Sequence, residues 1–530
     1  MVLNKTSHIY SLILVSFITF ASIDLHSNSI IKVDEDEAIS ENSNDDIKGE
    51  DDAPENLEEC MMQAKSKKDS KNCEKDFMKT IEEFIDEEEL VLVDGFLKIY
   101  TNEDGSVYFL KLDEGDLNSE FLYFSYIMNA PQGSPLTGGL PSDGKVLEFR
   151  NFKKDRIGLY QINTSYITGD PENNIAKSSI TNITEAFVEV FKPSARTDNS
   201  VLINVNSILL SEKMDSISYI PSEYREYVSV DYGRPDESKT FVKNVLNNDT
   251  NTAFEVTFAF ENTMPNSDAF SVSAVTDPRY LSVTGRHIFI KMPDDRFETR
   301  VNDHRVGYFV NKSTDLTSYD NFPNFALINK WRLIKKDPNA EMSEPEEPIV
   351  FWVENTTPEE IIPAVVAGIE NWNMAFEEAG FINAVVAKIQ PKDAEWDAAD
   401  YDYNVVRWSS EPDGNLLGIG PSVTNPLTGE IISGDVVNKL LAVKVGYNYR
   451  KLYGYTEDND PLMQYITNLT LHEVGHVLGL RHNFRGSYLY SPAEIHNKEI
   501  TGKTLMSSVM DYDPINVAPE GTEQGIYFST

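Results

Sequence analysis

The stretch LHEVGHVLGLRHN, residues 471–483, decides how the rest of the chain is interpreted, because it holds three of the eight histidines within eleven residues. On a helix His472 and His476 are one turn apart, so both imidazoles can reach one ion. Gly479 lets the chain leave the helix in a conformation that other residues resist, which turns His482 back towards the same point. Three neutral nitrogen donors suit Zn²⁺. A fourth position left to water is typical of a catalytic site.

Glu473 lies beside the first histidine, close enough to touch a metal-bound water without ligating the metal. A lone histidine is usually an ordinary core or surface residue, but three at this spacing are not explained in that way. A preserved but inactive metal site is the other interpretation. The carboxylate argues against it, since a purely structural site has no need of Glu473.

Two segments resemble the metzincin family. HEVGHVLGLRH (472–482) is similar to the signature HExxHxxGxxH of that family, and SSVMDYDP (507–514) is similar to its methionine turn. The resemblance implies Met510 as the turn methionine beneath the zinc. It also implies that Tyr512 approaches the metal or stabilises the reacting oxyanion.

A wider similarity runs from about residue 90 to 514, to a family of large exported bacterial zinc metallopeptidases. Those proteins carry a β-rich domain of uncharacterised function ahead of a metzincin-like domain. In that family the chain normally continues well beyond the position of Pro514, so we expect part of the C-terminal subdomain to be missing here. The segments that carry the similarity are DHRVGYF (303–309), WRLIKKDP (331–338), SEPEEPIVFWVENTTPE (343–359), AGIENWNMAFEEAGF (367–381) and GLRHNF (479–484).

The predicted fold class is α+β, with a mainly antiparallel N-terminal β domain followed by a metzincin-like catalytic domain. At 530 residues the chain is long enough for two or three domains. Lys5, a short apolar run and small residues after it indicate a signal peptide, and an uncleaved membrane anchor is the alternative. The predicted boundaries are 1–22 for the signal peptide, 23–90 for an acidic, largely disordered segment with short helices, 91–298 for the β domain, 299–348 for a connector and 349–530 for the catalytic domain.

Short stretches rich in β-branched and aromatic residues predict the β domain, and α/β order follows it. Thr357, Pro358 and Glu360 predict a capped helix start. Residues 416–423 and 429–437, around Asn425, predict a hairpin at a sheet edge. The predicted strands are 90–100, 105–112, 145–152, 156–163, 186–192, 252–260, 286–292, 349–355, 384–389 and 404–410.

Acidic residues outnumber basic ones 86 to 46, giving a net charge of −40. Such a surface repels nucleic acid and anionic lipid, so a nucleic-acid partner is excluded. Cys60 and Cys73 are the only cysteines. In an exported protein they could form a local disulfide, and a thiolate that plugs the zinc is the alternative.

The sequence thus predicts an exported, periplasmic or extracellular zinc endopeptidase with no stable membrane insertion after signal cleavage. Its partner would be a protein or peptide substrate, bound in extended form along the edge at 416–437. Glu473 would act as general base. A secreted binding or surface protein with a vestigial zinc site is the second hypothesis. A zinc amidase acting on cell-wall peptides is the third.

Overall fold

The computed structural model describes most of the chain from residue 78 onwards. Every element below belongs to the compact unit 74–530. The predicted signal peptide, most of the acidic segment and both cysteines lie outside the described residues. The described residues are 62, 64–66 and 78–530, except 132–137, 154, 171, 180, 216–231, 266–273, 294–296, 321–323 and 412–416.

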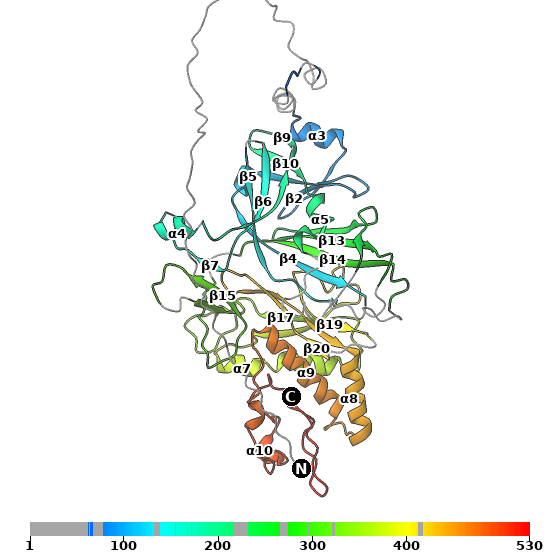
Figure 1. The fold of residues 1–530 in the computed structure, drawn as a ribbon. Helices are drawn as coiled ribbons and strands as arrows, with labels where there is room; N and C mark the ends of the chain where they lie inside the picture. The colour runs from blue at the N-terminus through cyan, green and yellow to red at the C-terminus, as the bar shows by residue number, and fades with distance from the viewer. Residues whose placement is uncertain are drawn as a thin grey trace, which may run out of the picture. The chain divides into compact units, whose positions relative to one another are not determined.

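Two antiparallel sheets form the N-terminal part (Figure 1). The smaller runs in the order β1 (Val91–Val93), β2 (Lys98–Thr101), β3 (Tyr108–Asp113), β10 (Ser200–Asn204), β9 (Pro193–Arg196). The larger runs in the order β11 (Arg234–Pro235), β13 (Asn251–Glu261), β14 (Tyr280–Lys291), β4 (Glu120–Asn129), β5 (Lys145–Phe152), β6 (Arg156–Gln161), β8 (Ala186–Phe191), with β12 (Phe241–Asn247) paired to β13. The predicted β-rich region is confirmed.

Strand β4 is buried on both faces, because its alternating side chains enter two different cores. Tyr123 and Ile127 belong to the core within the β-rich region. Leu122, Phe124 and Tyr126 belong to a second core, which also contains residues from the C-terminal half of the chain. The large sheet therefore packs against other structure on each side.

Two strands of a small sheet lie within the segment expected to be a connector, and the third strand comes from the β-rich region. The order of this sheet is β16 (Asn324–Ile328), β15 (Val310–Asp315), β7 (Tyr166–Ile167). The sequence VNKSTD of β15 is polar and gave no strand signal. Pairing with β16 and with the distant β7 supplies its hydrogen bonds.

The C-terminal half is built on a mixed sheet with helices against it (Figure 1). Its order is β18 (Val385–Ile389), β17 (Ile349–Val353), β19 (Asn404–Ser409), β23 (Val436–Lys439), β20 (Gly418–Ile419). The first four strands are parallel, and β20 is antiparallel at the edge. The strands predicted at 349–355, 384–389 and 404–410 are confirmed, as is the hairpin of β21 (Ser422–Thr424) and β22 (Ile431–Gly434).

Apolar side chains from α6 (Ile362–Glu370) and α9 (Pro461–Val477) pack against β17 and its neighbours to form the C-terminal core. None of the helices in the described part of the chain has the length and apolar character needed to cross a membrane. The helices are α3 (Ile81–Glu87), α4 (Asn174–Ser179), α5 (Asn206–Leu209), α6 (Ile362–Glu370), α7 (Asn373–Glu378), α8 (Leu440–Tyr453), α9 (Pro461–Val477) and α10 (Lys498–Thr501), with single 3-10 turns at Glu114–Asp116, Glu212–Met214 and Gly486–Tyr488.

The predicted start of α6 was wrong. Thr357 donates its backbone N–H to Glu354 in a turn, and the helix begins at Ile362. Glu360 is bonded to Arg450 instead of closing a capping box. Tertiary pairing with Arg450 on α8 therefore overrides the local capping signal.

Candidate metal centre

The helix that carries the first two histidines is fixed at both ends. At its start the side chain of Asp460 accepts a hydrogen bond of 3.0 Å from the Leu462 N–H, and Pro461 occupies the first turn. At its end Gly479 has φ +97°, in the left-handed region. A Cβ there would lie 2.1 Å from the Asn329 carbonyl oxygen, so only glycine fits. The predicted bend is present.

The three histidines converge on one point. The ligand nitrogens of His472, His476 and His482 all lie within 4.8 Å of one another. The Nε2 atoms of His476 and His482 are 3.1 Å apart. Two nitrogens bound to one tetrahedral zinc, at roughly 2.0–2.1 Å each, would be about 3.3–3.4 Å apart. The residues present fit a zinc ion.

Backbone carbonyls orient two of the rings. Nδ1 of His472 lies 2.7 Å from the Val509 carbonyl oxygen, and Nδ1 of His476 lies 2.8 Å from that of Leu480. A carbonyl can only accept, so each Nδ1 carries the proton and each Nε2 keeps a free lone pair for a metal. Burial lowers the pKa of His476 to about 4 and also lowers the pKa of His472. Both rings are therefore neutral near pH 7, as ligation requires.

Glu473 is buried between α9 and the edge strand β20. A Cβ on Gly418 would lie 3.0 Å from Glu473 Oε1, and one on Gly420 would lie 2.2 Å from the Glu473 carbonyl oxygen. These two glycines allow the strand to approach the carboxylate. Burial raises the pKa of Glu473 to about 8. A divalent cation beside it would favour the ionised form.

The predicted methionine turn lies directly under the helix. Met510 is 2% exposed, and a Cβ on Gly475 would be 2.3 Å from its Sδ. The Asn483 N–H donates to the Met510 carbonyl oxygen at 2.8 Å. The Tyr512 ring lies 5.6 Å from the ring of His472 and 4.7 Å from that of His482. Every site residue predicted from the sequence is thus brought to one place.

The segment DHRVGYF adds residues that were not predicted as part of the site. Tyr308 forms an antiparallel bridge with Leu480, and the Arg481 N–H donates to the Gly307 carbonyl oxygen at 2.8 Å. The ring of Phe309 lies 5.8 Å from that of His476. The segment is one of those that carry the wider family resemblance, but nothing local in its sequence predicts the pairing with Leu480.

The C-terminal residues also support α9. The Tyr527 N–H donates to Gln464 Oε1 at 2.7 Å, and Phe528 is 1% exposed within the C-terminal core. The Asp513 carboxylate accepts from the Ser529 N–H at 2.8 Å. The segment after the methionine turn therefore returns to pack on the helix that holds the histidines.

Comparison with known families agrees with this geometry. Residues 455–529 match a family model described as Met-zincin. Residues 139–336 match a model described as Domain of unknown function (DUF5117). No curated protein matches the chain. With its three-histidine group and its helix at Pro461–Val477, the C-terminal segment fits a metzincin, and the group is compatible with zinc.

Proposed function

We propose that this protein is a secreted zinc-dependent endopeptidase. The observation that carries the proposal is the buried Glu473 carboxylate, which follows the ligand His472 in the chain and lies against Gly418 of the edge strand. A metal site alone would explain the histidines. The buried carboxylate is the group that peptide hydrolysis needs in addition.

The reaction follows from the placement of the side chains. Zinc, when bound, supplies a Lewis acid that lowers the pKa of a coordinated water to roughly 7. Glu473 accepts the proton of the attacking water and returns it to the leaving amine of the cleaved peptide bond. His472, His476 and His482 hold their Nε2 atoms towards one point throughout. The Nδ1–H groups of His472 and His476 stay hydrogen-bonded to the backbone carbonyls of Val509 and Leu480.

The edge strand β20 is the proposed substrate platform. It ends the C-terminal sheet, and no strand of the described residues pairs with its outer side. An extended peptide could add there through backbone hydrogen bonds. Gly418 on this strand lies against Glu473, so the scissile bond would pass the carboxylate.

Tyr512 is the proposed oxyanion donor. Its side chain is 63% exposed and its ring stands beside two of the histidine rings, so the hydroxyl is free to turn towards substrate. Tyr512→Phe should lower kcat without changing zinc content. An unchanged kcat would remove this residue from the mechanism.

Glu473→Gln is the central test of the proposed function. The variant should retain zinc and lose about 10²–10⁴-fold in kcat on casein or a peptide library, because the proton acceptor is gone. Glu457→Gln, an exposed position in the loop before α9, is the matched control and should cleave normally. Equal activity of Glu473→Gln and wild type would refute the base assignment. Zinc binding by the wild type without any cleavage would favour a binding protein with a vestigial site.

Export is proposed from the N-terminal sequence. The basic residue, short apolar run and small residues there are typical of a cleaved signal. Mass spectrometry of the mature N-terminus from cell fractions tests it. An intact Met1 in a cytoplasmic fraction would contradict export.

A further inference from the structure

The β-rich region and the catalytic half share a hydrophobic core. Leu122, Phe124 and Tyr126 on one face of β4 pack in the same cluster as Ala399 and Val423 from the C-terminal half. A domain joined only by a flexible linker would not bury its sheet in this way. The contact is thus part of the folded core.

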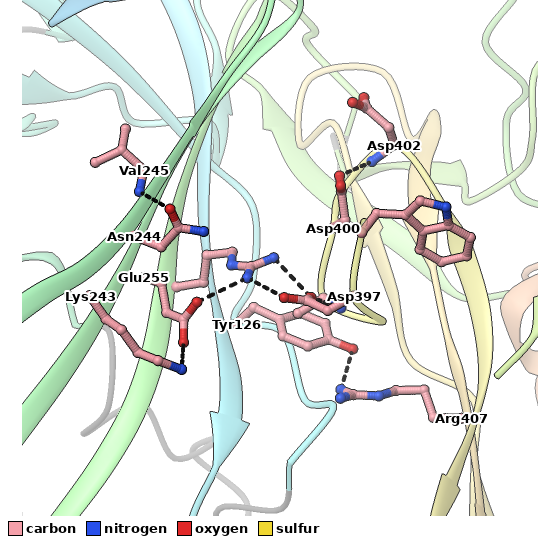
Figure 2. A network of polar contacts seen from close by, with 12 residues as sticks. Tyr126, Lys243, Asn244, Val245, Glu255, Asp397, Asp400, Asp402 and Arg407 are labelled. Carbon is pink, nitrogen blue, oxygen red and sulfur yellow. Dashed lines mark hydrogen bonds and ion pairs between the residues drawn. The ribbon is translucent and has the colours of Figure 1, made fainter. Parts of the chain in front are cut away.

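A buried polar group lies at the same contact (Figure 2). The Tyr126 hydroxyl donates to the Asp435 carboxylate, and Arg407 Nη1 donates to the Tyr126 oxygen at 3.0 Å. The Val405 N–H donates to Asp435 Oδ1 at 2.8 Å. Tyr126 comes from β4 of the β-rich region, whereas its partners lie on or beside β19 and β23. The hydroxyl therefore fixes a position in the catalytic sheet.

A second polar contact reinforces the first. Arg286 of β14 is 1% exposed, and its Nη2 is 2.7 Å from Asp397 Oδ2 and 3.4 Å from Glu255 Oε2. Lys243 pairs in turn with Glu255 at 2.6 Å (Figure 2). Such directional contacts set the alignment of the two halves as well as their attachment.

Asp435 lies between β22 and β23, and this corner contacts the segments that surround Glu473. The Asp435 N–H donates to the Pro421 carbonyl oxygen at 3.1 Å, next to Gly420, whose Cβ position faces the Glu473 carbonyl. A Cβ on Gly434 would be 2.3 Å from Val477 at the end of α9. The corner therefore touches both the edge-strand segment and the histidine helix.

The loop between β4 and β5 approaches the same strands. A Cβ on Gly139 would lie 2.7 Å from Val437 Cγ2 on β23, and one on Gly144 would lie 2.5 Å from the Thr424 carbonyl oxygen on β21. Glycine at both positions lets the loop backbone lie flush against the sheet. The β-rich region thus contacts β19, β21 and β23.

We infer that the β-rich region helps to position the residues of the catalytic site. Through Tyr126 it holds the Asp435 corner, and through that corner it holds β20 against Glu473, so that a substrate backbone meets the carboxylate in one register. Tyr126 is a positioning residue and does not touch the reacting atoms. The inference rests on the proposed function. It assigns a positioning role to the β-rich region, much of which matches a domain of unknown function.

Tyr126→Phe in the full chain tests this, with Tyr123→Phe as the matched control. Tyr123 lies on the same strand and is as deeply buried, but its hydroxyl bonds His287 within the β-rich region at 2.9 Å. Both variants lose one buried hydroxyl and should lose similar melting temperature. Tyr126→Phe should raise KM and lower kcat/KM about 10–100-fold on a peptide long enough to lie along β20, with zinc retained. Tyr123→Phe should stay within about twofold of wild type.

Equal kinetic losses in the two variants, or none in either, would overturn the inference. If the wild type binds zinc but cleaves no peptide, the proposed function fails and amide hydrogen exchange decides the inference separately. Exchange at 417–439 should then be faster in Tyr126→Phe than in Tyr123→Phe. Equal exchange there would overturn the positioning role.

Discussion

The histidines of the metal site and His287 differ in the hydrogen bonds that their ring nitrogens form. Two of the three site histidines keep a free Nε2 beside the other rings. His287 has both nitrogens occupied: Nε2 donates to the Leu209 carbonyl at 3.0 Å and Nδ1 accepts from the Tyr123 hydroxyl at 2.9 Å. Burial lowers the pKa of His287 to about 4. It is a structural, neutral imidazole.

This difference predicts a pH effect on stability. Between pH 6.5 and 4 an unfolded His287 binds a proton that the folded protein excludes. The contribution of His287 to the free energy of unfolding is therefore complete above pH 6.5 and is lost as the pH falls to about 4. From pH 7.5 to 4.5 this amounts to about 2–3 kcal/mol of unfolding free energy. His287→Gln should start less stable but lose correspondingly less on acidification, as measured by denaturant unfolding with chelator present. Identical pH slopes in the two proteins would contradict the assignment.

The metal site could be predicted from the sequence because its three histidines lie close together along the chain. One helical turn and one glycine bend bring His472, His476 and His482 together, and both are properties of a dozen consecutive residues. Phe309 was missed because its contact with His476 depends on pairing between segments more than 160 residues apart. Asp435 and Tyr126 were missed for the same reason.

Gly475 of helix α9 lies where the side chains of Met510 and Trp372 pack directly against the helix backbone. The Cβ position of Gly475 lies 2.3 Å from Met510 Sδ and 2.8 Å from Trp372 Cζ2. Trp372 also donates from Nε1 to the Leu471 carbonyl oxygen at 3.0 Å. The methionine turn and the residue that precedes α7 therefore both pack against α9 at Gly475.

Gly475→Ala should destabilise the protein although alanine is the better helix former. The gain in propensity is about 1 kcal/mol, whereas overpacking against Met510 costs about 1–3 kcal/mol and displaces the turn. We expect lower unfolding free energy and weaker zinc binding in a chelator competition. Adding Met510→Val should make room, so the double variant should lose less than the sum of the single losses. Additive losses would mean that the two positions are not in contact.

Secondary structure was predicted best where the pattern is strong. β17, β18 and β19 are apolar runs that fill the C-terminal core, and they were found. The start of α6 was misplaced because Glu360 bonds Arg450 across the fold. β15 was missed because its polar side chains show no alternation.

At the scale of the whole molecule, residues 74–530 form one compact unit. The predicted division into a β domain, a connector and a catalytic domain remains a prediction, but the described contacts cross each of those boundaries. β4 shares a core with the catalytic half, and Tyr308 pairs with the loop of the third histidine. Composition and periodicity along a chain do not reveal such contacts, because they report local preference only.

Zinc-edge X-ray absorption on the purified full-length chain tests the central claim most directly. We predict one zinc per chain, with three imidazole nitrogens at roughly 2.0–2.1 Å and one further light-atom ligand. His482→Ala should remove one imidazole from the spectrum and weaken zinc binding. A zinc site with two imidazoles or fewer in the wild type, or no zinc at all, would contradict the account.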